Sequence, residues 1–261
     1  MNGRRGQWVA EFVIVVVGVL AAFAVENWRQ SRSDTSAERH LLEGIVSDLT
    51  RDLQDLEGAL VSARARIAAT DELLKLVGDP DAGVVHATPP QNAPIGIGFS
   101  FRGETAVPDA VRSLYPPESF DAQQALLLTG HFAKFDVSDG SYGEARATGQ
   151  VELIGDADLR SAIAAYYYGA VRLRGTIDDR LGSAVPRFVA NLEEAGLSPA
   201  GGASDEQIAR TLRQLPVLVA GLKNVRYSAA LQGGLYLQQQ TATQDLRGRV
   251  TEALQTRQEN R

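Results

Sequence analysis

Residues 35–77 read TSAERHLLEGIVSDLTRDLQDLEGALVSARARIAATDELLKLV, and this stretch decides the fold of the chain. Its apolar residues recur every three or four positions with charged residues between them, which predicts a long amphipathic helix. Residues 35–38 fit a capping box that would start this helix, and Gly78-Asp79-Pro80 would end it. Its apolar face needs a partner, either later helices of this chain or a second chain. The apolar positions are Leu42, Ile45, Leu49, Leu53, Leu56, Leu60, Ala63, Ile67, Leu74 and Val77.

The carboxyl-terminal part of the chain, residues 118–261, repeats this kind of pattern. Long helices are expected over 157–194 and 205–258, separated by a Gly/Ser/Pro-rich turn, with Pro216 breaking the start of the second. Shorter helices are expected from Ser119 to Thr129 and between a cap at Ser138 or Asp139 and a stop at Gly149. Three long stripes in one chain bury one another most simply as an antiparallel bundle, so the predicted class is all-α.

Residues 78–117 form a Pro/Gly-rich insertion in this helical pattern. Ile95, Ile97, Phe99 and Phe101 alternate with small residues, which is compatible with one short strand. Two of the intervening residues are glycines, but Phe101 stands where a dinucleotide-binding fingerprint requires a third glycine. The insertion therefore predicts irregular structure and no nucleotide site.

Upstream of the amphipathic helix, residues 8–28 read WVAEFVIVVVGVLAAFAVENW. A helix from Trp8 to Trp28 would be about 30 Å long, the thickness of the hydrocarbon core, with an indole at each interface. This predicts a transmembrane helix that follows a short cytoplasmic segment, residues 1–7. A cleaved signal peptide is the rival interpretation, because Ala22-Phe23-Ala24 has the form of a cleavage site. Glu11 within the apolar region and the second tryptophan favour a retained anchor.

The basic residues that flank this segment indicate its orientation only weakly. Arg4 and Arg5 precede it, and Arg29 and Arg32 follow it. Because two arginines lie on each side, the free amino terminus decides the balance and favours an amino terminus on the inside. The rest of the chain would then lie outside the cytoplasm.

One face of the predicted span combines a carboxylate with small residues. Glu11, Gly18 and Ala22 share this face, and Gly18 and Ala22 form a small-xxx-small pair that lets another helix approach closely. The functional interpretation is a contact with a second copy of the span or with a membrane protein partner, in which Glu11 finds a polar partner. The alternative is that Glu11 snorkels to the interface and the small residues are incidental.

The opening of the chain resembles a known family. The run EFVIVVVGVL from Glu11, then Ala22, Glu26-Asn27-Trp28 and a charged helix with Leu41-Leu42, is similar to a family of uncharacterised bacterial single-span membrane proteins, domain of unknown function 6090. A second similarity covers residues 142–167. Ala10 and Glu26 depart from the family pattern. The resemblance implies an inner-membrane anchor with a helical extracytoplasmic or juxtamembrane domain, and it implies no known activity.

The composition excludes several classes of chemistry. The 261 residues include no cysteine, which removes thiolate metal sites, and the formal charge of −6 argues against a nucleic-acid partner. His40, His86 and His131 lie far apart in sequence, and no catalytic, cofactor or metal motif accompanies them. Two function classes remain: a membrane-anchored interaction or sensory module that acts through a membrane partner, and an enzyme with an unrecognised active site. A cluster of polar groups with perturbed pKa values in a deep pocket would favour the enzyme.

Overall fold

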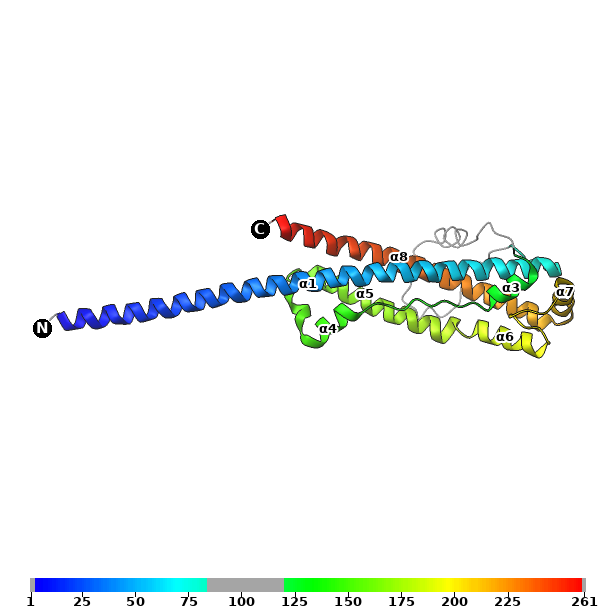
Figure 1. Cartoon of the computed structure of the whole chain (residues 1–261), viewed down its shortest axis with the longest axis horizontal. Helices are drawn as coiled ribbons and strands as arrows, with labels where there is room; N and C mark the ends of the chain where they lie inside the picture. Colours follow the sequence, from blue (N-terminus) through cyan, green and yellow to red (C-terminus); the bar gives the residue numbers. More distant parts are fainter. Residues whose placement is uncertain (1–2, 84–119, 260–261) are drawn as a thin grey trace, which may run out of the picture. The chain divides into compact units, whose positions relative to one another are not determined.

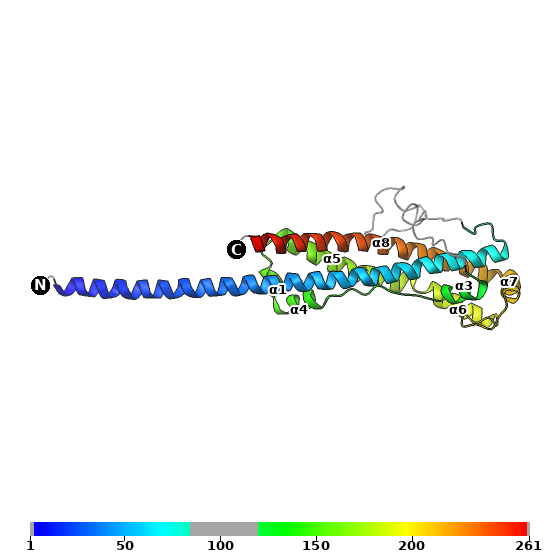
Figure 2. The same cartoon turned by 45° about the horizontal axis from the view of Figure 1, so that its top comes forward.

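The computed structural model describes residues 3–83 and 120–259, with side chains for residues 18–83 and 120–257 apart from Ser31 and Arg180 (Figures 1 and 2). Within these residues the chain forms helices and no strand, which confirms the predicted all-α class. The possible strand at 95–101 lies outside the described residues. The elements are α1 (Gly3–Val77), α3 (Ala122–Thr129), α4 (Gly140–Thr148), the 3-10 helix η1 (Gln150–Leu153), α5 (Ala157–Thr176), the π-helix η2 (Ile177–Leu181), α6 (Ala184–Glu194), α7 (Asp205–Gln214) and α8 (Pro216–Glu259).

These elements divide between two compact units. The first unit consists of residues 1–48, 139–162 and 249–261, and the second consists of residues 49–138 and 163–248. The first therefore holds the start of α1, α4, η1, the start of α5 and the end of α8. The second holds the remaining parts of these three long helices together with α3, η2, α6 and α7.

In the second unit, α8 runs antiparallel to α1. Arg66 of α1 donates to Gln232 of α8, and Asp71 of α1 pairs with Arg226 of α8, so the residue numbers rise along one helix as they fall along the other. Figures 1 and 2 show that the parts of α5 and α6 in this unit run in the same direction as α1. In this unit the predicted antiparallel arrangement is therefore found for α8 and is wrong for α5, which runs parallel to α1.

The helices α1 and α5 are parallel because the chain between α3 and α5 first runs back along α1 in an extended conformation. Residues 131–139 form no helix. The backbone amide of Ala133 donates to Ser62 Oγ at 3.1 Å, and that of Ser138 donates to Asp52 Oδ1 at 2.7 Å. As the chain advances through this segment, its partners move back along α1. Polar side chains of α1 thus hold this extended segment against the helix.

Most of the predicted apolar stripe is buried, whereas Leu53 and Val77 are half-buried. Leu42, Ile45, Leu49, Leu56, Ala63, Ile67 and Leu74 are each fully buried, and Leu60 is nearly so. A fully buried leucine or isoleucine contributes about 1.5–3 kcal/mol, so this face supplies a large part of the folding free energy. The second unit has two apolar clusters along its length, one around Leu73, Phe188, Leu212 and Leu222, and one around Leu56, Leu173 and Tyr236.

Two predicted helix ends are confirmed by the backbone. Gly78 and Gly149 follow α1 and α4 with φ near +75°, a conformation that residues with a side chain rarely adopt. At the end of α1 the amide of Asp79 also donates to Leu74 O at 3.0 Å, which is the long-range bond of a Schellman motif. Glycine at these positions fixes where both helices stop.

The predicted helix start at residues 35–38 is wrong. α1 is continuous from Gly3 to Val77, so these residues lie in a helix interior. No glycine or proline between Trp28 and Glu38 interrupts the helix. The Glu38 carboxylate instead accepts a hydrogen bond from the backbone amide of Gly155 at 2.8 Å. A motif typical of a cap therefore serves a tertiary contact.

The prediction of a single helix over 157–194 is also wrong. α5 ends at Thr176 and is followed by the π-turn η2. The amide of Gly182 donates to Ile177 O at 2.7 Å, and a Cβ at Gly182 would lie 2.9 Å from Asp178 O. Pro186 explains the new start at Ala184, because proline lacks an amide proton and is tolerated in the first turn of a helix but not in its interior. The result is a break between α5 and α6 that the periodic pattern did not indicate.

Candidate functional site

The five site residues predicted from the sequence all fall on α1. The side chains of Trp8 and Glu11 lie outside the described residues. Residues 18–30 are all exposed, including Gly18 and Ala22, and nothing lies within 4 Å of a Cβ built on Gly18. Trp28 is 57% exposed, and the Arg32 guanidinium stacks over its ring at 4.7 Å from the centroid. The described part of the chain therefore brings no partner to this face.

In residues 18–83 and 120–257, no helix has a stretch that is both apolar enough and long enough to cross a bilayer. Residues 8–17 of the predicted span lie outside that range.

In the first unit, acidic side chains of α1 accept hydrogen bonds from backbone amides of other segments. Asp48, which is 1% exposed, accepts a hydrogen bond from the amide of Ser141 at 2.8 Å. The predicted caps of α4, Ser138 and Asp139, make no such bond, so α1 supplies the acceptor that α4 lacks. Gly44 permits the close approach, because a Cβ there would lie 2.7 Å from Ser141 Oγ.

Glu38 is the second such acidic residue in the first unit. Its carboxylate accepts from the Gly155 amide and pairs with Arg257 of α8 at 2.7 Å. Next to this contact, a cavity of about 400 Å³ is lined by seven residues that include Asp156, Arg249 and Arg257. The amides of Leu159 and Asp158 donate to the Asp156 carboxylate and lower its pKa, with help from the nearby arginines. Helix capping explains this shift without a ligand.

In the second unit, a buried polar cluster surrounds the extended segment. The amide of Phe135 donates to Tyr236 Oη at 3.1 Å, and Gln232 donates to the same oxygen at 2.8 Å and to Ala133 O at 3.3 Å. Burial raises the pKa of Tyr236, although the hydrogen bonds that its oxygen accepts lower it. The cluster satisfies the backbone of a segment that has no helical hydrogen bonds of its own.

Tyr166 and Asp52 form a second buried contact in this unit. Tyr166 Oη donates to Asp52 Oδ2 at 2.6 Å and lies 3.1 Å from Thr243 Oγ1. Burial, followed by the hydrogen bond to the Asp52 carboxylate, holds the pKa of Tyr166 well above its usual range. The neighbouring Tyr167 is also buried, whereas Tyr168 is 67% exposed, so this part of α5 has one core face.

Arg66 is a fully buried cation. Its Nη2 donates to Gln232, its guanidinium lies 4.6 Å from the Phe132 ring centroid, and its Nε and Nη1 have no hydrogen-bond partner within the described part of the chain. Burial lowers the pKa of Arg66 to about 10. At neutral pH the side chain is therefore still charged, stabilised by an aromatic face and an amide.

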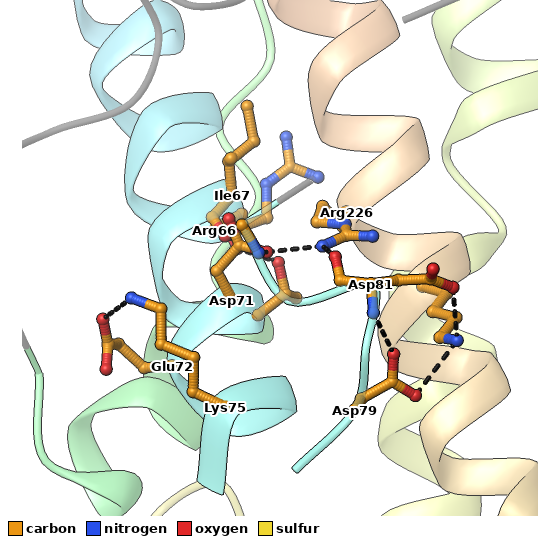
Figure 3. A network of polar contacts seen from close by, with 11 residues as sticks. Arg66, Ile67, Asp71, Glu72, Lys75, Asp79, Asp81 and Arg226 are labelled. Atoms are coloured by element: carbon orange, nitrogen blue, oxygen red, sulfur yellow. Dashed lines mark hydrogen bonds and ion pairs between the residues drawn. The ribbon is translucent and has the colours of Figure 1, made fainter. Parts of the chain in front are cut away.

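A third set of polar contacts holds the turn after α1 against α8 (Figure 3). Arg226 Nη1 lies 2.5 Å from Asp71 Oδ1 and donates to Asp81 O at 2.7 Å. Lys223 pairs with Asp81 at 2.7 Å and with Asp79 at 3.0 Å, and these carboxylates raise its pKa. A cavity of about 470 Å³ beside this turn is lined by Asp79 and Lys223, which satisfy each other.

A cavity of about 380 Å³ lies between α6 and α8 in the second unit. Val217 and Tyr227 contribute apolar surface, and Arg187, Asn191 and Asn224 contribute polar groups. Arg187 has no acidic partner within residues 18–83 and 120–257. In this respect the cavity differs from the two described above, whose lining includes paired basic residues.

No metal site is formed by the residues described, where no three His, Asp or Glu side chains gather. His40 is exposed and lies 3.6 Å from Glu43 on the same helix, and His86 lies outside the described residues. The polar residues of the core, among them Asp52, Arg66 and Arg226, were not singled out from the sequence. In the sequence, each can be recognised as a polar residue at a position that the helical repeat assigns to the core.

Comparison with known proteins adds no further assignment. The chain matches no family model, no curated protein and no solved structure. The resemblance to the single-span membrane family therefore stays an expectation from the sequence.

Proposed function

We propose that the protein is a single-span membrane protein whose helical body acts as an interaction or sensory module through a partner in the membrane. The observation that carries the proposal is the exposure of the amino-terminal part of α1. Val19, Leu20, Phe23 and Val25 are 49–63% exposed on a helix whose later turns are buried in protein. Each such side chain gains about 1.5–3 kcal/mol when it leaves water. Lipid is the environment that would cover the whole circumference of a helix at once.

The sequence on either side of this part of α1 supports the same proposal. Helical backbone extends to Gly3, so residues 8–28 provide about 30 Å of helix. Trp28 with Arg32 stacked on it would occupy the interface where the span ends, since aromatic and basic residues favour that region. With Arg4 and Arg5 inside, the helical body would lie on the extracytoplasmic side of a bacterial inner membrane.

The alternative of an enzyme receives no comparable support from the described residues. Burial and hydrogen bonds to backbone or neighbouring side chains explain the raised pKa of Tyr166 and of Tyr236. Lys223 owes its raised pKa to two carboxylates that hold a turn. These groups stabilise the fold and do not converge on a common cavity. An interaction module is therefore the better-supported class.

Membrane extraction and amino-terminal sequencing test the proposal. The protein should resist alkaline carbonate extraction and retain its original amino terminus, and a mature chain that starts at Val25 would contradict a retained anchor. Val16→Arg combined with Leu20→Arg should release it, because arginine near the centre of a span costs about 2.5–3.5 kcal/mol. Val61→Arg, on an exposed apolar position of the same helix, is the matched control and should leave extraction unchanged. A reporter enzyme active only outside the cytoplasm, fused after Arg261, tests the orientation.

A further inference from the structure

The cavity between α6 and α8 has the construction of a small-ligand site. Its volume of about 380 Å³ falls within the range of roughly 300–1,000 Å³ that small-molecule sites occupy. Phe188 is 1% exposed, so it belongs to the packed wall beneath the cavity and not to its open surface. Val217 and Tyr227 also line the cavity and are 56% and 40% exposed, so the site is open to solvent.

The packing of Phe188 in this wall depends on one glycine. A Cβ at Gly221 would lie 2.7 Å from Phe188 Cδ2, so the ring can pack against the α8 backbone only because residue 221 lacks a side chain. Across the cavity, Ser228 Oγ donates to Leu181 O at 2.9 Å and ties the end of the π-turn to α8. π-turns occur frequently at functional sites. The contacts that hold the walls together therefore do not involve Arg187, Asn191 or Asn224.

Those polar groups have no partners in the described part of the chain. The side chains of Arg187, Asn191 and Asn224 make no hydrogen bond or ion pair there. Two basic residues that line other cavities are paired: Lys223 with two aspartates, and Arg257 with Glu38. Arg187 therefore brings an uncompensated positive charge to an apolar surface.

We propose that this cavity binds a small organic anion with an apolar body, such as an aryl-alkyl carboxylate. The guanidinium of Arg187 would bind the carboxylate through two parallel hydrogen bonds, and the amides of Asn191 and Asn224 are further donors at the rim. The apolar body would lie against Tyr227 and Val217. This inference goes beyond the proposed function, because it requires neither the membrane span nor a membrane partner.

The full-length protein in lipid nanodiscs, titrated calorimetrically with 4-phenylbutyrate, tests the proposal. Empty nanodiscs give the background from lipid partitioning. The carboxylate should bind with a Kd below about 1 mM, and 4-phenylbutylamine and 4-phenylbutanol, which share its apolar body, should bind at least about tenfold more weakly. Equal affinity for the three compounds, or no saturable binding of the carboxylate, would overturn the proposal.

Paired variants assign any binding to the cavity. Arg187→Gln should weaken binding by about tenfold or more, because a charge-assisted hydrogen bond is lost. Arg210→Gln removes another exposed arginine, on α7, and should have no effect. Asn224→Trp should block the cavity, whereas Gln244→Trp places the same side chain on an exposed position of the same helix. Circular dichroism shows whether the two variants of a pair have the same helix content. Equal affinity within both pairs would show that the ligand binds elsewhere and would refute the assignment.

Discussion

Arg226 of α8 and Asp71 of α1 form a buried ion pair in the second unit, with 2.5 Å between Nη1 and Oδ1 and side chains only 9% and 5% exposed. The same carboxylate accepts from the Gly83 amide, and the same guanidinium nitrogen donates to Asp81 O. One ion pair therefore joins two helices to the turn that follows α1. Because both charges are out of water, neither is compensated without the other.

We expect that Asp71→Leu lowers the free energy of unfolding by about 3–5 kcal/mol, because it leaves the Arg226 charge buried and unpaired. Arg226→Met should cost a similar amount. The double variant should be more stable than either single variant, since apolar side chains then replace both charges. Urea unfolding followed by helical circular dichroism measures these differences. Glu72→Gln, which breaks an exposed pair with Lys75, is the control and should change stability by less than about 1 kcal/mol.

The buried phenol of Tyr166 should make stability fall at high pH. Its pKa is raised in the folded state, so above about pH 10 the unfolded chain releases a proton that the folded chain keeps. Stability is therefore fully present below pH 10 and declines as the pH rises beyond it. In urea unfolding at pH 8, 10 and 11, Tyr166→Phe should show a smaller decline than the natural protein.

Tyr168→Phe provides the matched control for this experiment. It removes the same hydroxyl from the same helix at a position that is 67% exposed. Its stability should follow that of the natural protein at every pH. An identical decline in the Tyr166 and Tyr168 variants would show that the Tyr166 hydroxyl does not carry the effect.

In the first unit, we expect Glu38 to stabilise the positions of Gly155 and of the carboxyl-terminal end of α8. Glu38→Ala removes the acceptor for the Gly155 amide and the partner of Arg257. Hydrogen exchange at Gly155 and over residues 249–257 should become faster, by a factor that corresponds to about 1–3 kcal/mol for a lost hydrogen bond to a charged group. Glu43→Ala removes a carboxylate whose partners Arg39 and His40 lie on the same exposed face. Equal exchange rates in the two variants would contradict the role of Glu38.

The apolar stripe of α1 could be predicted because spacing alone defines a helix face, whereas the polar core could not. Buried positions follow steps of four and three residues, and Asp52, Arg66 and Thr70 occupy such positions. A polar residue in this register predicts a buried polar contact, but the sequence does not say which distant group it meets. Asp52 meets the extended segment and Arg66 meets α8, each more than sixty residues away in the chain, whereas Thr70 donates to carbonyl groups of its own helix. The full register is Glu38, Leu42, Ile45, Leu49, Asp52, Leu56, Ala59, Ala63, Arg66, Thr70 and Leu73.

Local backbone chemistry separates the helix ends that were predicted from those that were not. The stops at Gly78 and Gly149 depend on a glycine with positive φ, which is a property of a single residue. The break between α5 and α6 depends on Pro186, whose effect was hidden because the apolar period continues through Ile177, Leu181 and Val185. The cavity beside that break, with Arg187, was missed for the same reason. A proline inside a periodic pattern should therefore outweigh the pattern.

The last prediction concerns the face of the proposed span that carries Glu11, Gly18 and Ala22. Lipid tails are as apolar as leucine, so helices associate in a membrane only where backbones approach closely or polar groups meet. Gly18→Ile should weaken association of the span with its own copy or a partner by on the order of 1 kcal/mol or more. Val19→Ile lies about 100° around the helix and should have little effect. Both positions are exposed, and the space around a Cβ at Gly18 is empty, so neither variant disturbs the described fold. Cross-linking in mild detergent compares the two variants, and equal association, or none in the natural protein, would show that the small residues do not form a contact.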